Sequence, residues 1–407
     1  MKHIVLKCRN NHNLRIGADT FNKLFIVLIL LFPIISIYWG GVSSLTIADV
    51  FLLFFALFYA LKGSYRHYDG IWLSYLIYIV IHCLITSIFY TDTNVVDNFI
   101  FLRYLLYIFT LTFLIPKHFN LELGLHYLKQ IGKFTSIFCI LQATSLYILG
   151  FYIKGYIPFL PIMNEALTKY GNNIASTFRI RGFLAEPAHL AEYMTLILIV
   201  FLFTEGKHNK IWAVLASISV LFSISKTGLI MLVFLWCVYF YFDMFRKHPL
   251  ILKDYIKFIL LIMVVLVIVL IFLKSSLYEY TERTFDFAYR GRMNGYDAIK
   301  NLWHNNNNLQ MLLGHSYVRD TSVYLSSYPV IFWRYGITGL LVFCIIFIRL
   351  YYRCDLHYQK IICFALLILF VGTELFISPR ILPHLAFVTL FQHKCQSEAT
   401  IVFPIVD

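Results

Sequence analysis

The chain has 407 residues, of which 60% are hydrophobic and only 14% are charged. Soluble domains carry roughly 25% charged and about 45–50% apolar residues, so this composition excludes an ordinary soluble domain. The net charge of +13 would indicate nucleic acid in a soluble protein. Here no nucleic-acid partner is expected, because most of the basic residues flank apolar segments in the pattern of a membrane protein.

Long apolar segments predict an all-α polytopic membrane protein. A helix needs about 17–25 apolar residues to cross a bilayer, and the chain offers about 11 or 12 such segments. The first has no small-residue cleavage site after it, so we expect it to be retained. The expected spans cover residues 23–40, 45–61, 70–90, 98–115, 131–153, 190–205, 210–224, 227–245, 257–273, 328–349 and 360–377, with a shorter candidate at 381–392. Residues 1–407 are therefore expected to form a single membrane domain.

The distribution of Lys and Arg predicts the orientation of the spans. Cytoplasmic loops of membrane proteins carry an excess of basic residues. With the N-terminus in the cytoplasm, Lys7, Lys62 and Arg353 fall inside. The expected outside connections at 41–44 and 91–97 contain no Lys or Arg. We therefore expect a multi-pass protein with a cytoplasmic N-terminus.

Two expected outside loops, 154–189 and 274–327, break this charge rule. Their basic residues are Lys154, Lys169, Arg179 and Arg181 in the first loop and Lys274, Arg283, Arg290, Arg292, Lys300 and Arg319 in the second. Cations on the wrong side of a membrane indicate an anionic ligand. The alternative is that long loops cross regardless of charge, with acidic neighbours such as Glu282 and Asp286 offsetting the cations.

Residues 179–194, RIRGFLAEPAHLAEYM, place ionisable side chains at the expected edge of the membrane. Ionisable groups there indicate function by default. Pro187 suits the first position of a helix, which makes Glu186 the expected N-cap. His189 and Glu192 are three residues apart and should share one helix face. The competing interpretation, weighted equally, is a capped span whose arginines extend to the interface.

These residue types suit phosphate chemistry. Arg179 and Arg181 come just before a helix N-terminus, where backbone N–H groups also favour anions, so they are candidate phosphate or diphosphate ligands. Glu186, His189 and Glu192 are candidate general bases.

Two further cations are candidates for the same site. Arg334 lies six residues from the expected outer end of its span, which favours an external cavity over lipid exposure. Residues 223–228, SISKTG, contain both S-x-x-K and K-T-G, but penicillin-binding enzymes keep those elements far apart, so the overlap is attributed to chance. We expect Ser225 and Thr227 to cap the next span and Lys226 to face the cavity. No acidic cluster resembles a metal site, and neither a metal nor a cofactor is expected.

Four motifs together resemble the bacterial O-antigen polymerases and O-antigen ligases. They are R-x-R-G-F-L-A-E-P-A-H-L-A-E-Y, the S-I-S-K-T-G turn, the Arg-rich loop ending in L-L-G-H-S, and W-R-Y-G-I-T-G-L-L. The resemblance covers residues 175–350 in order and spacing, whereas the N-terminal half matches only in its pattern of spans. The segment after the eleventh span is short, which departs from the family pattern.

The resemblance implies metal-independent glycosyl transfer at the outer face of the bacterial inner membrane, by a fold like that of other polytopic, lipid-dependent glycosyltransferases with an extracytoplasmic cap loop. The donor would be a glycan on undecaprenyl diphosphate, and a chain-length regulator protein would be a possible partner. Arg181, Arg290 and Arg292 would match the family's diphosphate-binding arginines. Glu186 and a loop histidine, His315 or His304, would match its acid–base positions.

The leading hypothesis is therefore an O-antigen polymerase that joins lipid-linked repeat units. A ligase that moves the finished glycan onto the lipopolysaccharide core would use nearly the same residues. A flippase or other transporter of lipid-linked sugars is the alternative from another class, because about twelve spans also suit a transporter. Transporters usually place ionisable groups near the middle of the membrane, whereas here the sequence concentrates them in two outside loops.

Overall fold

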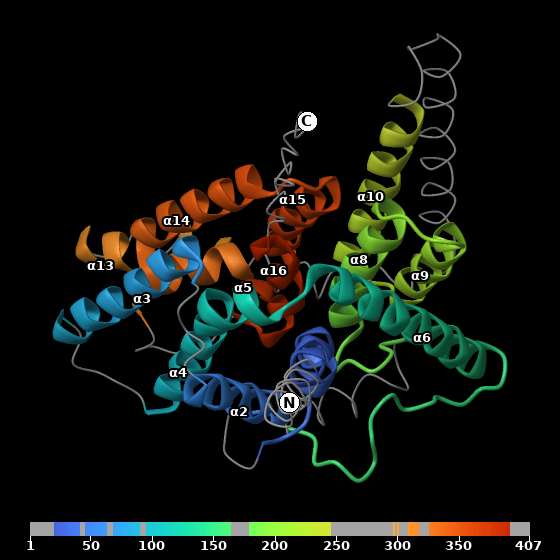
Figure 1. Ribbon diagram of the computed structural model, residues 1–407, viewed down its shortest axis with the longest axis horizontal. Coiled ribbons are helices and arrows are strands. Elements are labelled where there is room, and N and C mark those ends of the chain that lie inside the picture. Colours follow the sequence, from blue (N-terminus) through green and yellow to red (C-terminus); the bar gives the residue numbers. More distant parts are fainter. Residues whose placement is uncertain are drawn as a thin grey trace, which may run out of the picture.

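The structure is a computed structural model, and it describes residues 20–40, 45–62, 68–89, 95–163, 179–245, 296–297, 299–300, 308–316 and 325–390. Helices dominate this part of the chain (Figure 1). The long helices are α2 (Ile47–Leu61), α3 (Gly70–Phe89), α4 (Val95–Phe109), α6 (Leu121–Tyr147), α8 (Pro187–Phe203), α9 (Asn209–Ser223), α10 (Lys226–Phe245), α14 (Ser327–Arg353) and α15 (His357–Gly372). The short ones are α5 (Ile115–His118), α13 (Asn308–Leu313) and α16 (Leu382–Thr389).

A further apolar helix covers Thr20–Ile35, and a π-helical segment, Thr110–Leu114, joins α4 to α5. Two 3₁₀ turns, Leu375–Ile377 and Pro379–Ile381, lead into α16. Within the described ranges there is no β-strand, only isolated bridges such as that between Tyr38 and Ile162. The expected all-α class is confirmed.

Three described helices are long and apolar enough to cross a membrane: Gly70–Phe89, Ile100–His118 and Ser327–Arg353. Six others are apolar but shorter. These helices support the expected multi-pass membrane character. The expected span at 257–273 lies outside the described residues, so the number of spans stays a prediction.

The short span candidate at 381–392 corresponds to α16. Eight helical residues rise only about 12 Å, less than half of the roughly 30 Å hydrocarbon core. Helix α16 is therefore too short to cross a membrane alone.

Helix α8 lies inside the bundle, packed against α6, α9, α10 and α15 (Figure 1). All of its residues from Leu190 to Leu202 are buried, Glu192 among them. A helix that is apolar all round is stable only where neighbours cover every face. Tyr193 also donates a hydrogen bond from its hydroxyl to the Leu30 carbonyl at 2.7 Å, which ties α8 to the first helix. The polar side chains of α8 therefore face protein.

The segment after α15 turns back into the bundle. The Ser327 hydroxyl donates to the Thr373 carbonyl at 2.7 Å and accepts from the Phe376 backbone N–H at 3.0 Å. At the other end of α16, the Gln359 side chain donates to the carbonyls of Phe387 and Leu390. These contacts fix both ends of the returning segment, and they hold the 3₁₀ turns between them beside α8.

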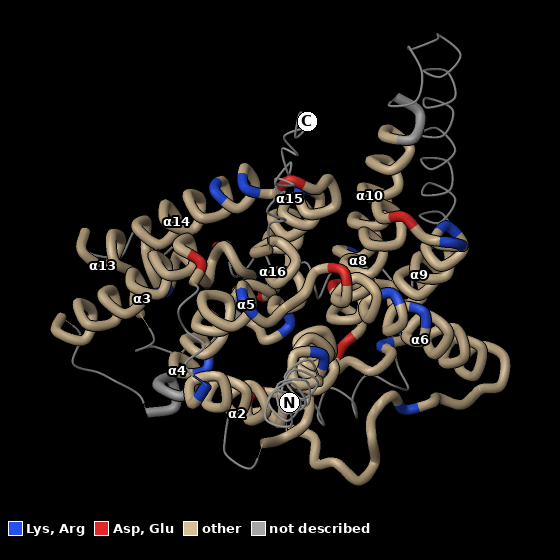
Figure 2. Tube along the Cα trace, viewed as in Figure 1, with Lys and Arg blue, Asp and Glu red and all other residues tan. Residues whose placement is uncertain are grey.

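Charged residues are sparse along the described helices and lie mostly at or near helix ends (Figure 2). One ion pair of this kind lies where α14 ends, between Arg353 and the buried Asp69. Arg353 also donates to the Thr389 carbonyl at 2.9 Å, so this pair joins α14 and the start of α3 to the end of α16.

Helix α14 is broken at Gly336, whose φ of 63° and ψ of −158° are not helical. The break frees the carbonyls of Trp333 and Arg334, which in a continuous helix would bond to residues four positions later. They accept instead from the backbone N–H groups of His315 at 2.7 Å and Ser316 at 2.8 Å. The sequence motifs LLGHS and WRYGITG are therefore joined backbone to backbone.

Candidate functional site

The start of α8 has the predicted geometry. Pro187 is the first helical residue, and Glu186 is the N-cap with an extended backbone. The Glu186 side chain makes no capping hydrogen bond. Instead its Oε2 lies 3.6 Å from Nε2 of His189, and the side chain is 28% exposed. The carboxylate is thus left accessible beside an imidazole, which suits a general base.

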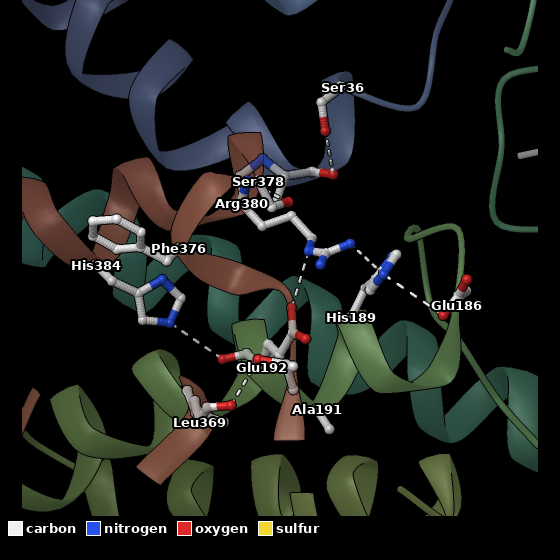
Figure 3. A network of polar contacts seen from close by, with 12 residues as sticks. Ser36, Glu186, His189, Ala191, Glu192, Leu369, Phe376, Ser378, Arg380 and His384 are labelled. Carbon is white, nitrogen blue, oxygen red and sulfur yellow. Dashed lines mark hydrogen bonds and ion pairs between the residues drawn. The ribbon is translucent and has the colours of Figure 1, made fainter. Parts of the chain in front are cut away.

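Arg380, in the second 3₁₀ turn, meets the same helix face (Figure 3). Its Nε lies 3.0 Å from Oε2 of Glu192, and its Nη1 contacts Nε2 of His189. The Glu192 side chain is only 3% exposed. The prediction that His189 and Glu192 share a face is confirmed, because one guanidinium reaches both.

The backbone around Arg380 holds it in place. The Arg380 N–H donates to the Ser378 hydroxyl at 3.3 Å, and Ser378 caps the 3₁₀ turn. In α16, four residues after Arg380, Nε2 of His384 lies 3.3 Å from the carbonyl oxygen of Glu192 (Figure 3). We call Glu186, His189, Glu192, Arg380 and His384 the α8 cluster.

Arg380 can only donate to His189, because a guanidinium has five N–H donors and no acceptor.

Arg181 is buried, with 2% exposure. Its Nε donates to the Tyr152 hydroxyl at 3.1 Å, and its Nη1 donates to the Ala185 carbonyl at 3.1 Å. Arg179 is half-buried, and its Nε donates to the Ser223 carbonyl at 2.9 Å. The described contacts of both arginines thus brace the loop before α8.

Gln142 of α6 organises that loop. Its Oε1 accepts from the backbone N–H groups of Arg181 at 3.2 Å and Gly182 at 2.9 Å, and its Nε2 donates to the Ile153 carbonyl at 2.6 Å. Gly182 has a φ of 59°, and a Cβ on the facing Gly155 would lie 1.8 Å from the Gly182 carbonyl. Glycine at positions 155 and 182 thus allows the two loop segments to pack backbone against backbone.

A second group of predicted residues lies at the break in α14. His315 is buried, and its ring centroid lies 4.4 Å from that of Trp333. Arg334 is partly buried, one residue from Tyr335, which packs edge-on against the His82 ring. Nε2 of His82 lies 2.6 Å from the Leu313 carbonyl, so α3 also supports this group.

Lys226 begins α10, as expected for the residue after a cap. Ser225 comes directly before α10, and its hydroxyl accepts from the Gly228 N–H at 3.4 Å, as a cap would. Thr227, the other expected cap, lies inside α10 instead. A Cβ on Gly228 would lie 2.5 Å from that of Ala191, so the start of α10 packs against the α8 turn that carries the cluster.

Arg290, Arg292 and His304 lie outside the described residues. The neighbouring Tyr296 is described, and its hydroxyl donates to the Val371 carbonyl at 3.0 Å. The same hydroxyl accepts from the Ser326 hydroxyl at 3.5 Å. This part of the loop at 274–327 therefore touches the ends of α14 and α15 that adjoin the segment leading to Arg380.

The sequence interpretation missed Arg380, His384 and Gln142. A signal for Arg380 was present: SPRILPH places a cation between two prolines in apolar sequence, and Glu192 is an acid inside another apolar helix. A buried cation and a buried acid are expected to pair.

In the described part of the chain, no group of three His, Cys, Asp or Glu residues is placed to hold a metal ion. Comparisons with protein-family models, curated proteins and solved structures found no match to this chain.

Proposed function

We propose that the chain is a glycosyltransferase that polymerises oligosaccharide repeats carried on undecaprenyl diphosphate, as an O-antigen polymerase does. The observation that carries the proposal is the start of α8, where the accessible Glu186 carboxylate lies 3.6 Å from His189 and Arg380 backs the imidazole. An acid–base pair, a cation and a buried supporting helix are the parts that such a transfer needs.

At the anomeric carbon, the proposed reaction makes one bond and breaks one. Glu186, assisted by His189, accepts the proton of the acceptor hydroxyl, and the acceptor oxygen bonds to the anomeric carbon of the donor. The bond from that carbon to the diphosphate oxygen breaks, and its electron pair leaves with the lipid diphosphate. Fixed cations stabilise the charge that develops on this leaving group. In this proposal Arg290, Arg292 and Arg334 supply those cations.

The location follows from the same proposal. The chain would sit in the bacterial inner membrane with a cytoplasmic N-terminus, so that α8 begins near the outer face. Its partners would be membrane lipid, the lipid-linked glycan and a chain-length regulator protein. The basic residues of the loop at 274–327 would then face the substrate as a cap.

A reconstituted reaction tests the polymerase proposal. The purified protein in lipid nanodiscs is incubated with undecaprenyl-diphosphate-linked repeats and no other protein, and the products are sized on a gel. A ladder of polymers is expected. If no ladder forms, and a deletion strain shows normal chain-length banding of its surface glycan, the polymerase proposal is wrong. Bare lipopolysaccharide core with accumulating lipid-linked glycan would identify a ligase.

One observation favours a transporter as the second candidate. Glu192, in the second turn of α8 and about 16 Å along the helix axis from Phe203, is buried and forms an ion pair with the largely buried Arg380. Ionisable groups inside a bundle are typical of transport pathways. Movement of lipid-linked repeats across vesicle membranes by the purified protein, without polymer, would establish transport.

A further inference from the structure

The segment that follows α6 exposes large apolar side chains on an irregular backbone. Residues 148–159 contain no helix and no strand, and they run along the edge of the molecule (Figure 1). Within them Ile148, Leu149, Phe151 and Phe159 are each more than half exposed. Closely spaced exposed apolar side chains mark a surface that a partner or a membrane covers. We call residues 148–159 the α6 exit segment.

The backbone of this segment is unsuited to the hydrocarbon core of a membrane. Outside a helix or sheet, N–H and C=O groups need water or other polar partners, which lipid chains do not supply. Gly150, with a φ of 73°, and Pro158 interrupt any regular hydrogen-bond ladder. Apolar side chains favour lipid, whereas this backbone requires water. The membrane–water interface supplies both.

Aromatic and basic side chains around the segment also match a membrane interface. Tyr147, the last residue of α6, is 44% exposed. Trp39 is 43% exposed, and its backbone N–H donates to the Pro161 carbonyl at 2.8 Å. Tyr and Trp are enriched at membrane–water interfaces. The Nζ of the exposed Lys154 lies 5.7 Å from the centroid of the Tyr156 ring, and a lysine there can extend its ammonium group to lipid phosphates.

The exposed apolar surface continues along α6. Phe134, Ile137 and Leu141 are exposed and precede Ile148 at helical spacings, so the four side chains share one face. In a multi-pass membrane protein such a face is covered by acyl chains, which are as apolar as leucine. The α6 exit segment therefore begins where a lipid-facing stripe ends.

The α6 exit segment is tied to the loop that carries Glu186. The Tyr152 hydroxyl accepts from Nε of Arg181 at 3.1 Å. Just beyond the segment, Ile162 packs with Ala185 in a small apolar cluster. Ala185 directly precedes Glu186. The depth of the segment in a membrane therefore sets the depth of the accessible end of the α8 cluster.

We propose that the α6 exit segment lies in the membrane–water interface, in contact with lipid headgroups and the upper part of the acyl chains, and that it holds Glu186 at headgroup depth. Lys154 then binds membrane lipid, whereas its charge alone suggested a substrate anion. The consequence for the substrate rests on the proposed function. A donor whose lipid tail fixes its diphosphate at the membrane surface would reach Glu186 without leaving the bilayer.

Fluorescence quenching by brominated lipids measures this depth. Full-length Phe159→Trp protein is reconstituted into phosphatidylcholine vesicles whose acyl chains carry bromine either near the headgroup or near mid-chain. Subtracting the wild-type emission leaves the signal of the added tryptophan. Bromine near the headgroup should quench this signal about twofold more than mid-chain bromine, because interfacial side chains reach only about 5–10 Å into the boundary between headgroups and acyl chains.

Three further variants make the comparison internal. Ile81→Trp, at an exposed position near the middle of the candidate span Gly70–Phe89, should show the opposite preference, for mid-chain bromine. Trp39→Phe removes a native reporter, and the emission that it removes should show the headgroup preference. Phe183→Trp, at a partly exposed position three residues before Glu186, reports the depth of the α8 loop and should show the headgroup preference too.

Equal emission of Phe159→Trp protein in brominated and unbrominated vesicles would overturn the proposal, because water or a second copy of the chain would then cover the segment. Stronger quenching by mid-chain bromine would also overturn it, since the segment would lie in the hydrocarbon core. The absence of headgroup preference at position 183 would refute the depth of Glu186. The polymer ladder is read separately. A ladder without interfacial quenching refutes the membrane contact alone, whereas interfacial quenching without a ladder refutes the polymerase alone.

Discussion

Arg380 and Glu192 form an ion pair, with Nε 3.0 Å from Oε2, that joins the C-terminal segment to the most buried helix of the bundle. The pair does more than offset two charges. It orients the guanidinium so that Nη1 reaches His189, which in turn faces the accessible Glu186. A chain of contacts thus runs from the buried Glu192 to the partly exposed Glu186, through one cation and one imidazole (Figure 3).

Breaking this ion pair from one side should destabilise the protein more than removing both charges. Glu192→Gln leaves the largely buried Arg380 without its counter-charge, and breaking a buried pair from one side typically costs about 3–5 kcal/mol of unfolding free energy. The double variant Glu192→Gln with Arg380→Gln should recover much of that loss. Unfolding of the four proteins of this cycle in detergent, followed by near-ultraviolet circular dichroism, measures the coupling. Equal stability of wild-type and Glu192→Gln protein would contradict it.

Glu186→Gln should abolish transfer with little change in stability. The side chain is partly exposed and makes no capping hydrogen bond, so the unfolding free energy should change by less than about 0.5 kcal/mol. Loss of a general base should lower the polymerisation rate by about 10²–10⁴-fold. Glu205→Gln, at an exposed residue between α8 and α9, is the matched control and should keep full activity. Wild-type polymerisation by Glu186→Gln protein would remove Glu186 from the site.

The local pattern of the sequence predicts the elements of this site well. Pro187 predicts the helix start, and the three-residue spacing of His189 and Glu192 predicts their shared face; the structure confirms both. These features depend only on neighbours within one or two helical turns.

The tertiary partners could not be predicted in this way. Arg380 meets α8 because the segment after α15 folds back, which depends on contacts such as Ser327 with Thr373 and Phe376. Similarly, the charge pattern around Arg181 predicts a diphosphate ligand, whereas its described contacts are with Tyr152 and Ala185. Local spacing carries no information on such long-range packing.

Gln142→Leu should loosen the loop before α8. The substitution leaves the N–H groups of Arg181 and Gly182 and the carbonyl of Ile153 without their partner. Each buried unsatisfied group costs about 1–3 kcal/mol. We expect faster cleavage between residues 151 and 186 in limited proteolysis, together with reduced polymerisation, because Glu186 follows directly. Gln142→Glu preserves the acceptor and should retain part of the protection. An unchanged cleavage rate in Gln142→Leu protein would show that the loop is held by other contacts.

Gly336→Ala should disrupt the junction between α14 and the His315 segment. Gly336 has a φ of 63°, and an added Cβ would lie 2.4 Å from the Leu312 carbonyl. Steric strain of this kind costs of order 1–3 kcal/mol. The carbonyls of Trp333 and Arg334 would then be drawn back into a continuous helix, and the N–H groups of His315 and Ser316 would lose their acceptors. Hydrogen exchange of residues 314–316 should accelerate at least tenfold. Gly70→Ala, where an added Cβ meets nothing within 4 Å, is the control, and its exchange at 314–316 should match wild type. Unchanged protection in Gly336→Ala protein would mean that His315 is positioned independently of the break in α14.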